Sequence, residues 1–161
     1  VHWWPWGTEA FAAAQAQGLR LAADDTWSDI LSRLIVEKVE PHLGHGRPTV
    51  LDRYPASEAA LARRAPDDPR VAERFELYAC GVELANGFGE LTDPIEQRAR
   101  FEADMDEKAR IYGERYPLDE DFLSALAHMP PASGIAMGFD RVVMLATAAP
   151  SLDRVQWAPS G

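Results

Sequence analysis

The sequence predicts an α+β fold in which an antiparallel sheet is flanked by helices. Residues 73–86 form two runs of alternating apolar and polar residues that meet at Cys80-Gly81, a pattern typical of a β-hairpin. In residues 94–112 the apolar residues recur at helical spacing instead. Residues 133–149 resemble an apolar strand that enters a helix. This mixture of elements favours the α+β class.

The N-terminal residues 1–39 are predicted to form a helical segment, followed by a second region at 40–161. Ala10 to Ala23 is rich in alanine, and Asp25-Thr26 precedes apolar residues at helical spacing up to Pro41. The Trp-rich start, "VHWWPWG", is interpreted as an irregular segment whose indoles cover a core or an interface. A ligand-stacking platform is the alternative interpretation.

The residues that precede the hairpin are dense in proline and glycine. We predict one short strand, Thr49 to Leu51, and a short helix from a Ser57 cap through Arg64. The sequence "PDDP" at residues 66–69 is interpreted as a turn. The histidines are scattered without carboxylates or cysteine at coordination spacing, which disfavours a metal role for them.

The second half of the chain is predicted to hold three helices and a last short strand. Asp93 is expected to cap the first helix, with Pro94 at its first position and Glu96 closing a capping box. A shorter helix is expected from Asp119 to His128. Residues 154–157, "RVQW", are predicted to form the final strand.

The composition indicates one soluble globular domain, or one part of a larger domain. The apolar runs are far shorter than the roughly 20 residues that span a bilayer, and the single cysteine, Cys80, gives no disulfide framework. We therefore expect a cytoplasmic protein without a membrane segment. A formal net charge of -10 disfavours nucleic acid as a partner.

The hairpin suggests a binding face. With a two-residue loop, Glu76 and Glu83 become diagonal neighbours on one face. The other face then carries an apolar set expected to pack on helices: Phe75, Leu77, Val82 and Leu84. Two glutamates on one face repel each other, so the face is either solvated or binds a cation. Mg²⁺ is the natural cation, because it accepts carboxylates together with nucleotide phosphates.

A second feature is "GIAMGFDR", which places glycines beside Arg141 where a strand feeds a helix. Such a layout suits close approach of a nucleotide and donors to its phosphates. It is neither a Rossmann fingerprint nor a P-loop, and the glycines have a packing interpretation as well. The residues alone thus indicate a Mg²⁺-nucleotide site, with a solvated sheet face as the alternative.

The stretches "RFELYACGVELANGFGELTD" and "SGIAMGFDRVVML" together resemble the C-terminal half of a class II lysyl-tRNA synthetase catalytic domain, the second being similar to motif 3. The similarity runs from about Glu40 to Trp157. It is stronger to the elongation factor P (R)-β-lysine ligase family, whose members lack the anticodon-binding domain. Three features favour that family: "YPASEAALARRAPDDPRVAERFE", "ELANGF", and Ala136 where synthetases usually carry glycine.

The resemblance implies roles for individual residues. Those implied to bind ATP are Glu76, Glu83, Leu84, Gly138 and Arg141. Those implied to bind the amino acid are Asn86, Phe88, Glu90 and Ala136. In this scheme Glu76 and Glu83 hold Mg²⁺, Arg141 holds the γ-phosphate, and Glu90 pairs with the side-chain ammonium. Glu83 and Arg141 are the implied catalytic residues.

The implied reaction is ATP-dependent formation of an aminoacyl-adenylate from lysine or β-lysine, followed by transfer to a lysine of elongation factor P. Nothing before Glu40 resembles motif 1 or motif 2, so we expect a fragment or a truncated form that is inactive alone and dimeric at full length. Gly89 departs from the family, which often has histidine there. The alternatives are lysyl-tRNA synthetase-type aminoacylation and a non-catalytic synthetase-like binding or regulatory module.

The stretch "VELANGFGEL", residues 82–91, raises a question of local structure. Taken alone, Asn86-Gly87 predicts that a strand ends in a tight turn. Regular alternation would point Glu83 and Glu90, seven residues apart, to opposite faces. We therefore expect a bulge at Gly87 or Gly89 that resets the register and brings both carboxylates into one pocket.

Overall fold

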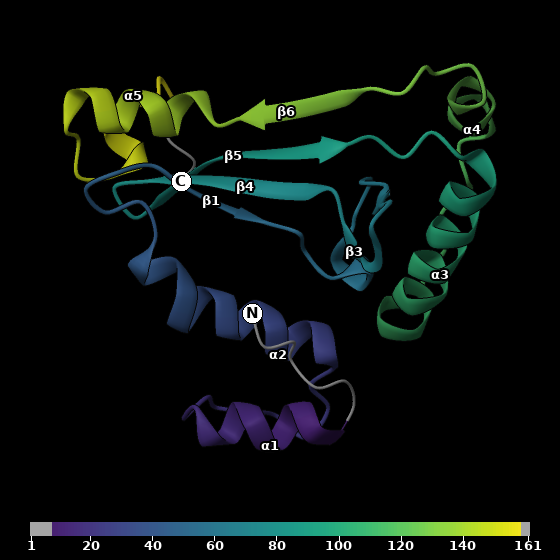
Figure 1. The fold of residues 1–161 in the computed structure, drawn as a ribbon, viewed down its shortest axis with the longest axis horizontal. Helices are drawn as coiled ribbons and strands as arrows, with labels where there is room; N and C mark the ends of the chain where they lie inside the picture. The colour runs from purple at the N-terminus through teal and green to yellow at the C-terminus, as the bar shows by residue number, and fades with distance from the viewer. Residues whose placement is uncertain (1–7, 159–161) are drawn as a thin grey trace. The chain divides into compact units, whose positions relative to one another are not determined.

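The computed structural model describes residues 8–158, with side chains from residue 12 onward, and confirms the α+β class (Figure 1). Its main sheet has the strand order β1-β4-β5-β6, with β1 at Thr49–Asp52, β4 at Arg74–Ala79, β5 at Val82–Gly89 and β6 at Ser133–Met137. A second sheet pairs β2 (Arg64–Ala65) with β3 (Asp68–Ala72). The helices are α1 (Thr8–Ala16), α2 (Trp27–Leu34), α3 (Pro94–Tyr112), α4 (Glu120–Leu126) and α5 (Phe139–Thr147).

The chain divides into two compact units. Unit 1 holds the described residues up to Leu51, Glu76–Asn86 and the described residues from Met137; unit 2 holds Asp52–Phe75 and Gly87–Ala136. This division does not follow the predicted boundary after residue 39, which stays a prediction. The "VHWWPWG" segment lies outside the described residues, and so does the question of what its indoles cover.

The N-terminal part of unit 1 is helical, as predicted. α1 is shorter than predicted, ending at Ala16, and Gly18 next takes the left-handed φ of 72°. Thr26 caps α2 as expected, in a reciprocal capping box with Asp29. A π-helical segment, Ile35–Val39, and a 3₁₀ turn, Glu40–His42, then carry the chain towards β1.

A tight turn joins β4 to β5 and confirms the two-residue loop. Cys80 and Gly81 both have positive φ, 54° and 75°, as a type I′ hairpin turn requires. The turn rests on Gly44, whose carbonyl accepts a hydrogen bond from the Cys80 N–H at 2.7 Å. A Cβ on Gly44 would lie 2.7 Å from the Cα of Ala79, so only glycine allows this close approach.

The predicted helix from Ser57 to Arg64 is wrong. Helical structure there is limited to a 3₁₀ turn at Ala56–Glu58, because Ala60 adopts a left-handed φ of 50°. The chain then enters β2, which pairs antiparallel with β3 around a turn at residues 66–67, the first half of the turn predicted at residues 66–69. The sequence pattern did not predict this hairpin, because its short strands carry charges and a proline instead of alternating apolar and polar residues.

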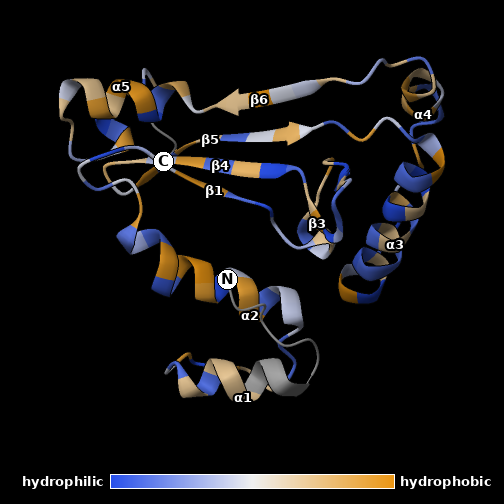
Figure 2. Ribbon diagram, viewed as in Figure 1, coloured by the Kyte–Doolittle hydropathy of each residue, from blue (hydrophilic) through white to orange (hydrophobic). Residues whose placement is uncertain are grey.

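Unit 2 also contains the two charged helices. Asp93 caps α3 by accepting hydrogen bonds from the N–H groups of Ile95 and Glu96, and Asp119 caps α4. Hydrophilic residues cover most of α3 (Figure 2), and Gln97 is its one buried residue among those described.

The last strand predicted at "RVQW" is wrong, because Leu152–Arg154 in unit 1 forms a 3₁₀ turn.

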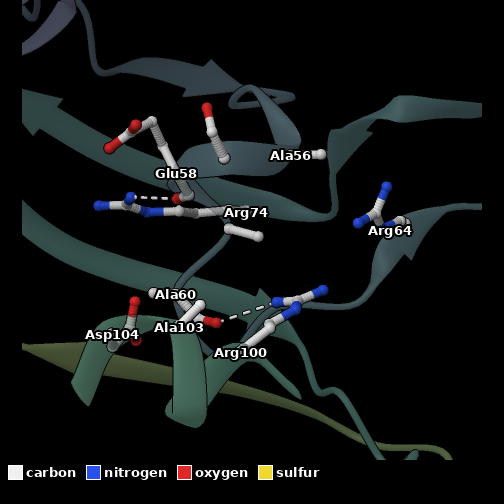
Figure 3. Close-up of a pocket in the computed structure, with 10 residues that line it drawn as sticks. Ala56, Glu58, Ala60, Arg64, Arg74, Arg100, Ala103 and Asp104 are labelled. Carbon is white, nitrogen blue, oxygen red and sulfur yellow. Dashed lines mark hydrogen bonds between the residues drawn. The ribbon is translucent and has the colours of Figure 1, made fainter. Parts of the chain in front are cut away.

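Three arginines hold the irregular backbone of unit 2 around a cavity of about 390 Å³ (Figure 3). Arg100 donates to the carbonyls of Ala60 and Ala62, at 3.0 and 2.8 Å, and to the Glu96 carboxylate. Arg74 donates to the carbonyl of Glu58. The Glu96 carboxylate also accepts from Arg64. Burial raises the pKa of Glu96, but the hydrogen bonds from the two arginines outweigh it and leave this pKa lowered.

We predict that Gly44→Ala destabilises the chain strongly. The substitution adds the left-handed conformational penalty, about 1–2 kcal/mol, to a backbone clash of about 1–3 kcal/mol. Gly46→Ala is the matched control, because Gly46 has a similar φ of 72° and nothing within 4 Å of its added Cβ. Urea unfolding of both variants measures the clash as their difference, and equal losses would contradict the close approach.

We also predict that Arg100→Ala lowers the free energy of unfolding by about 2 kcal/mol, because two backbone carbonyls and a carboxylate lose a donor. Arg64→Ala is the control. The Arg64 side chain is 53% exposed, so its loss should change stability by at most about 0.5 kcal/mol. Urea unfolding at neutral pH compares the two, and an Arg100→Ala variant as stable as Arg64→Ala would show that the carbonyls need no such support.

Candidate functional site

Four of the residues implied to bind ATP, namely Glu83, Leu84, Gly138 and Arg141, come together in unit 1, where β5 and the start of α5 meet. Nη1 of Arg141 donates to the backbone carbonyl of Glu83 at 2.8 Å and to its carboxylate at 3.1 Å. The N–H of Gly138 donates to the carbonyl of Leu84 at 2.8 Å. Residues far apart in the sequence therefore share one corner, and an arginine is held beside a carboxylate there.

Gly138 has a packing role in this corner. A Cβ at Gly138 would lie 3.3 Å from Cδ of Arg141 and 3.5 Å from its Cγ. The arginine stem thus lies against the bare backbone at the N-terminus of α5. Its guanidinium is partly exposed, with 41% of the side chain accessible, so it can still reach an anionic group.

Glu76 lies on the buried side of the hairpin. The hydroxyl of Tyr78 lies 2.7 Å from Oε2 of Glu76 and 3.2 Å from Oε1 of Glu40. Tyr78 is 1% exposed and Glu76 8% exposed. The Tyr78 hydroxyl has one proton and can donate it to only one of the two carboxylates at a time. Tyr78 therefore links two acidic groups in a poorly solvated place.

The predicted orientation of the hairpin is therefore partly wrong. The carboxylate face was expected to be wet or to bind a cation, and the apolar face to be packed. Instead Glu76 and Tyr78 are buried, whereas the apolar set is only half-buried: Phe75, Leu77, Val82 and Leu84. Sequence reasoning also missed Glu40 and gave Tyr78 no role. The hairpin register places Tyr78 on the same face as Glu76 and Glu83, and this is the sequence signal that could have indicated its role.

Glu76 and Glu83 suit a metal ion that takes its other ligands from outside the protein. Among the described residues, no group of three or more acidic, histidine or cysteine side chains could hold a metal ion by itself. Glu76 and Glu83 project from the same side of a hairpin whose two-residue loop makes them diagonal neighbours. Two carboxylates suit Mg²⁺ that takes its remaining ligands from water and nucleotide phosphates.

Asn86 carries a buried acceptor that no protein group satisfies. Its Oδ1 atom is inaccessible to solvent and accepts no hydrogen bond within the described structure. An unsatisfied buried acceptor is destabilising by about 1–3 kcal/mol, and native structures keep few of them. A ligand N–H that donated to Oδ1 would remove this penalty, which agrees with the implied contact between Asn86 and the amino acid.

The remaining implied amino-acid ligands, Phe88, Glu90 and Ala136, lie in unit 2. Phe88 is half-buried and packs against a small cluster of buried alanines, whereas Ala136 is exposed. Glu90 follows β5 and donates its N–H to the carbonyl of Ala132 at 3.0 Å. Its carboxylate lies against Gly134, where an added Cβ would be 2.5 Å from Oε1.

The predicted turn at Asn86-Gly87 is wrong, because β5 continues through it to Gly89. The register is nonetheless reset within β5, as expected. The two-residue loop pairs Ala79 with Val82, whereas the Gly89 N–H donates to the Glu73 carbonyl at 2.8 Å and Gly87 lies against the ring of Phe75. The strand β5 therefore carries one extra residue, which precedes Gly87 instead of lying at Gly87 or Gly89. The extra residue reverses the alternation after it, so Glu90 returns to the face of the strand that carries Glu83. Gly87 serves close packing, since a Cβ there would run into the ring of Phe75.

A second cavity, of about 330 Å³, lies beside Phe88 and Gly89 in unit 2. Arg63 and Glu73 form an ion pair on its wall, with Nε 2.6 Å from Oε2. A Cβ on Gly89 would collide with this Glu73 carboxylate. At Gly89, where the family often has histidine, the Arg63–Glu73 ion pair occupies the space of a side chain. The sequence analysis did not predict this ion pair.

Comparison with known proteins supports the architecture. The family model described as "tRNA synthetases class II (D, K and N)" matches residues 32–160. None of the helices in the described part of the chain has both the length and the apolar character needed to cross a membrane.

Two similar relatives are named elongation factor P--(R)-beta-lysine ligase. The chain is 51% identical to that of Klebsiella pneumoniae subsp. pneumoniae over 127 residues, which is 78% of this chain and 39% of the relative. It is 47% identical to that of Sodalis glossinidius over 139 residues, 86% of this chain and 43% of the relative.

A third relative is the lysine--tRNA ligase of Staphylococcus haemolyticus, 43% identical over 152 residues, 94% of this chain and 30% of the relative. The chain thus spans well under half the length of each of these relatives. The family model, in contrast, covers most of the chain, from the end of α2 onward. The chain therefore belongs to the class II tRNA synthetase family of the D, K and N group.

Proposed function

We propose that this chain is part of an ATP-dependent ligase that activates lysine or (R)-β-lysine and transfers it to a lysine of elongation factor P. The observation that carries the proposal is the contact between Arg141 and Glu83, 58 positions apart in the sequence. It unites a phosphate-binding side chain with a metal-binding one at the place that the resemblance assigns to ATP. The names of the ligase relatives support the proposed substrate and acceptor.

The proposed reaction has two steps. A carboxylate oxygen of the amino acid attacks the α-phosphorus of ATP, the bond to the β-phosphate breaks, and pyrophosphate leaves with the electron pair. An amine of the acceptor then attacks the acyl carbon of the adenylate, and an amide forms as AMP and a proton are released. Neither step requires a nucleophile from the protein.

The protein contributes charge and position. Mg²⁺, bound with ATP, supplies neutralisation of phosphate charge. Glu76 and Glu83 would hold that ion, and Tyr78 would fix the Glu76 carboxylate by its hydrogen bond of 2.7 Å. Arg141, whose Nη1 donates to the Glu83 carboxylate, would direct its other N–H groups to the γ-phosphate.

The amino acid would be recognised through complementary hydrogen bonds. Asn86 offers an unsatisfied Oδ1, and Glu90 offers a half-buried carboxylate for the side-chain ammonium. Phe88 would form a wall against the aliphatic part of the side chain. The methyl group of Ala136 would reshape the pocket in favour of a β-amino acid.

The cellular setting is part of the same proposal. A cytoplasmic location is supported by the single free cysteine, Cys80. A homodimer at full length is part of the proposal, because motif 1 builds the dimer interface in the class II synthetases that this chain resembles.

Aminoacylation of tRNA is the second candidate function. It is favoured by the lysine--tRNA ligase relative, which aligns with 94% of this chain. The chain's formal charge of -10 opposes it, because a polyanionic acceptor would be repelled. The two candidates share the activation step and differ only in the acceptor, so transfer of labelled lysine to tRNA or to elongation factor P separates them.

We predict ATP–pyrophosphate exchange that depends on lysine or β-lysine, measured on this chain and on any longer protein that contains it. Glu83→Gln should reduce exchange by at least about 100-fold, because a charge that holds the metal is lost. Glu102→Gln, an exposed position on α3, is the matched control and should retain full exchange.

The outcomes are separable. Exchange from a longer protein alone would identify the chain as an incomplete part of the enzyme. No exchange from either would end the ligase proposal and leave a non-catalytic binding or regulatory module. Full exchange by Glu83→Gln would remove the metal assignment from Glu83 while leaving the reaction in place.

A further inference from the structure

We infer that Gly134 is a positioning residue for substrate recognition, because its missing side chain provides the space in which the Glu90 carboxylate lies. The inference rests on the proposed function, in which Glu90 pairs with the ammonium of the amino acid. It concerns unit 2 alone, where both residues lie. The substrate class it defines is an amino acid with a second, cationic amine.

The backbone of Glu90 is fixed on both sides. On one side its N–H donates to the Ala132 carbonyl at 3.0 Å, and β5 and β6 run antiparallel (Figure 1). On the other side Glu90 forms a bridge with Ala62, flanked by hydrogen bonds from Leu91 N–H to the Leu61 carbonyl and from Arg63 N–H to the Gly89 carbonyl. Only the side chain of Glu90 is therefore free to move.

The side chain lies over the backbone of β6. A Cβ at Gly134 would be 2.5 Å from Oε1 of Glu90 and 3.7 Å from its Cδ, and it would meet no other atom within 4 Å. Gly134 has no left-handed φ, so its backbone conformation suits any residue. Within the described structure, glycine is therefore required at position 134 only because the Glu90 carboxylate occupies the space of a side chain.

This arrangement separates position from stability. An alanine at 134 displaces the end of a flexible side chain and leaves the sheet hydrogen bonds intact. The displaced carboxylate can no longer meet an ammonium at the 2.7–2.9 Å typical of a charge-assisted bond. Recognition of the amine should thus weaken while the ATP corner, which lies in unit 1, is unchanged.

The test is Gly134→Ala, assayed by ATP–pyrophosphate exchange in whichever protein shows exchange. We expect KM for lysine or β-lysine to rise about tenfold or more, for a weakened ammonium contact. KM for ATP and the free energy of unfolding should stay near their original values. Ser133→Ala, the preceding position on β6, is the matched control and should leave both KM values unchanged.

Rescue distinguishes positioning from a general structural role. Glu90→Asp shortens the side chain by one methylene, so the carboxylate withdraws from the added methyl group. In the Gly134→Ala background this second change should recover part of the lost affinity, although alone it should weaken binding. Discrimination against norleucine, which lacks the ammonium, should fall in Gly134→Ala and recover in the double variant.

Other results overturn the inference. An unchanged lysine KM in a folded Gly134→Ala variant would show that the Glu90 carboxylate is not held by this space. Equal losses for lysine and ATP, or a loss of stability without rescue, would show a merely structural glycine. If the original protein shows no exchange at all, the proposed function fails and the inference falls with it.

Discussion

The register of the β4–β5 hairpin is the constraint on which the candidate site depends. A strand that slips by one residue turns every side chain to the opposite face, so the loop decides which residues are buried. The positive φ angles of Cys80 and Gly81 set a two-residue turn, and the Gly44 carbonyl holds it in place. Glu76 and Tyr78 consequently face the interior together, with their hydrogen bond already made.

Opposite charges within the site compensate for one another. Glu83 repels Glu76 on the same side of the hairpin, yet it pairs with Arg141, which also caps the Glu83 carbonyl. In the proposed function, Glu83 would hold the cation of a triphosphate and Arg141 would hold a phosphate, so each charged side chain would keep an opposite charge beside it. Under that proposal, binding would leave no side-chain charge buried and unpaired, which would otherwise cost several kcal/mol.

Sequence signals within a few residues correctly predicted the turns and helix caps that depend on neighbouring residues. The hairpin at Cys80-Gly81, the Thr26 and Asp93 caps, and the strand that enters a helix at Arg141 all follow from turn and capping chemistry within a few residues. The proposed roles of the site residues came from the resemblance and stay predictions. Which face of the hairpin is buried could not be predicted, because burial depends on residues distant in the sequence, such as Glu40, whose carboxylate lies 3.2 Å from the Tyr78 hydroxyl across 38 positions.

Glycine is the residue whose meaning the sequence left most open. Asn86-Gly87 has the local signature of a turn, but the ring of Phe75 and the Glu73 carboxylate lie where the side chains of residues 87 and 89 would be. The chain therefore continues as a strand through Asn86-Gly87, and its glycines let neighbouring groups approach the backbone. Gly134 acts in the same way towards Glu90. In this sheet, Gly87, Gly89 and Gly134 leave space for a neighbouring side chain. Turn propensity alone predicts a turn at such glycines and does not account for their packing role.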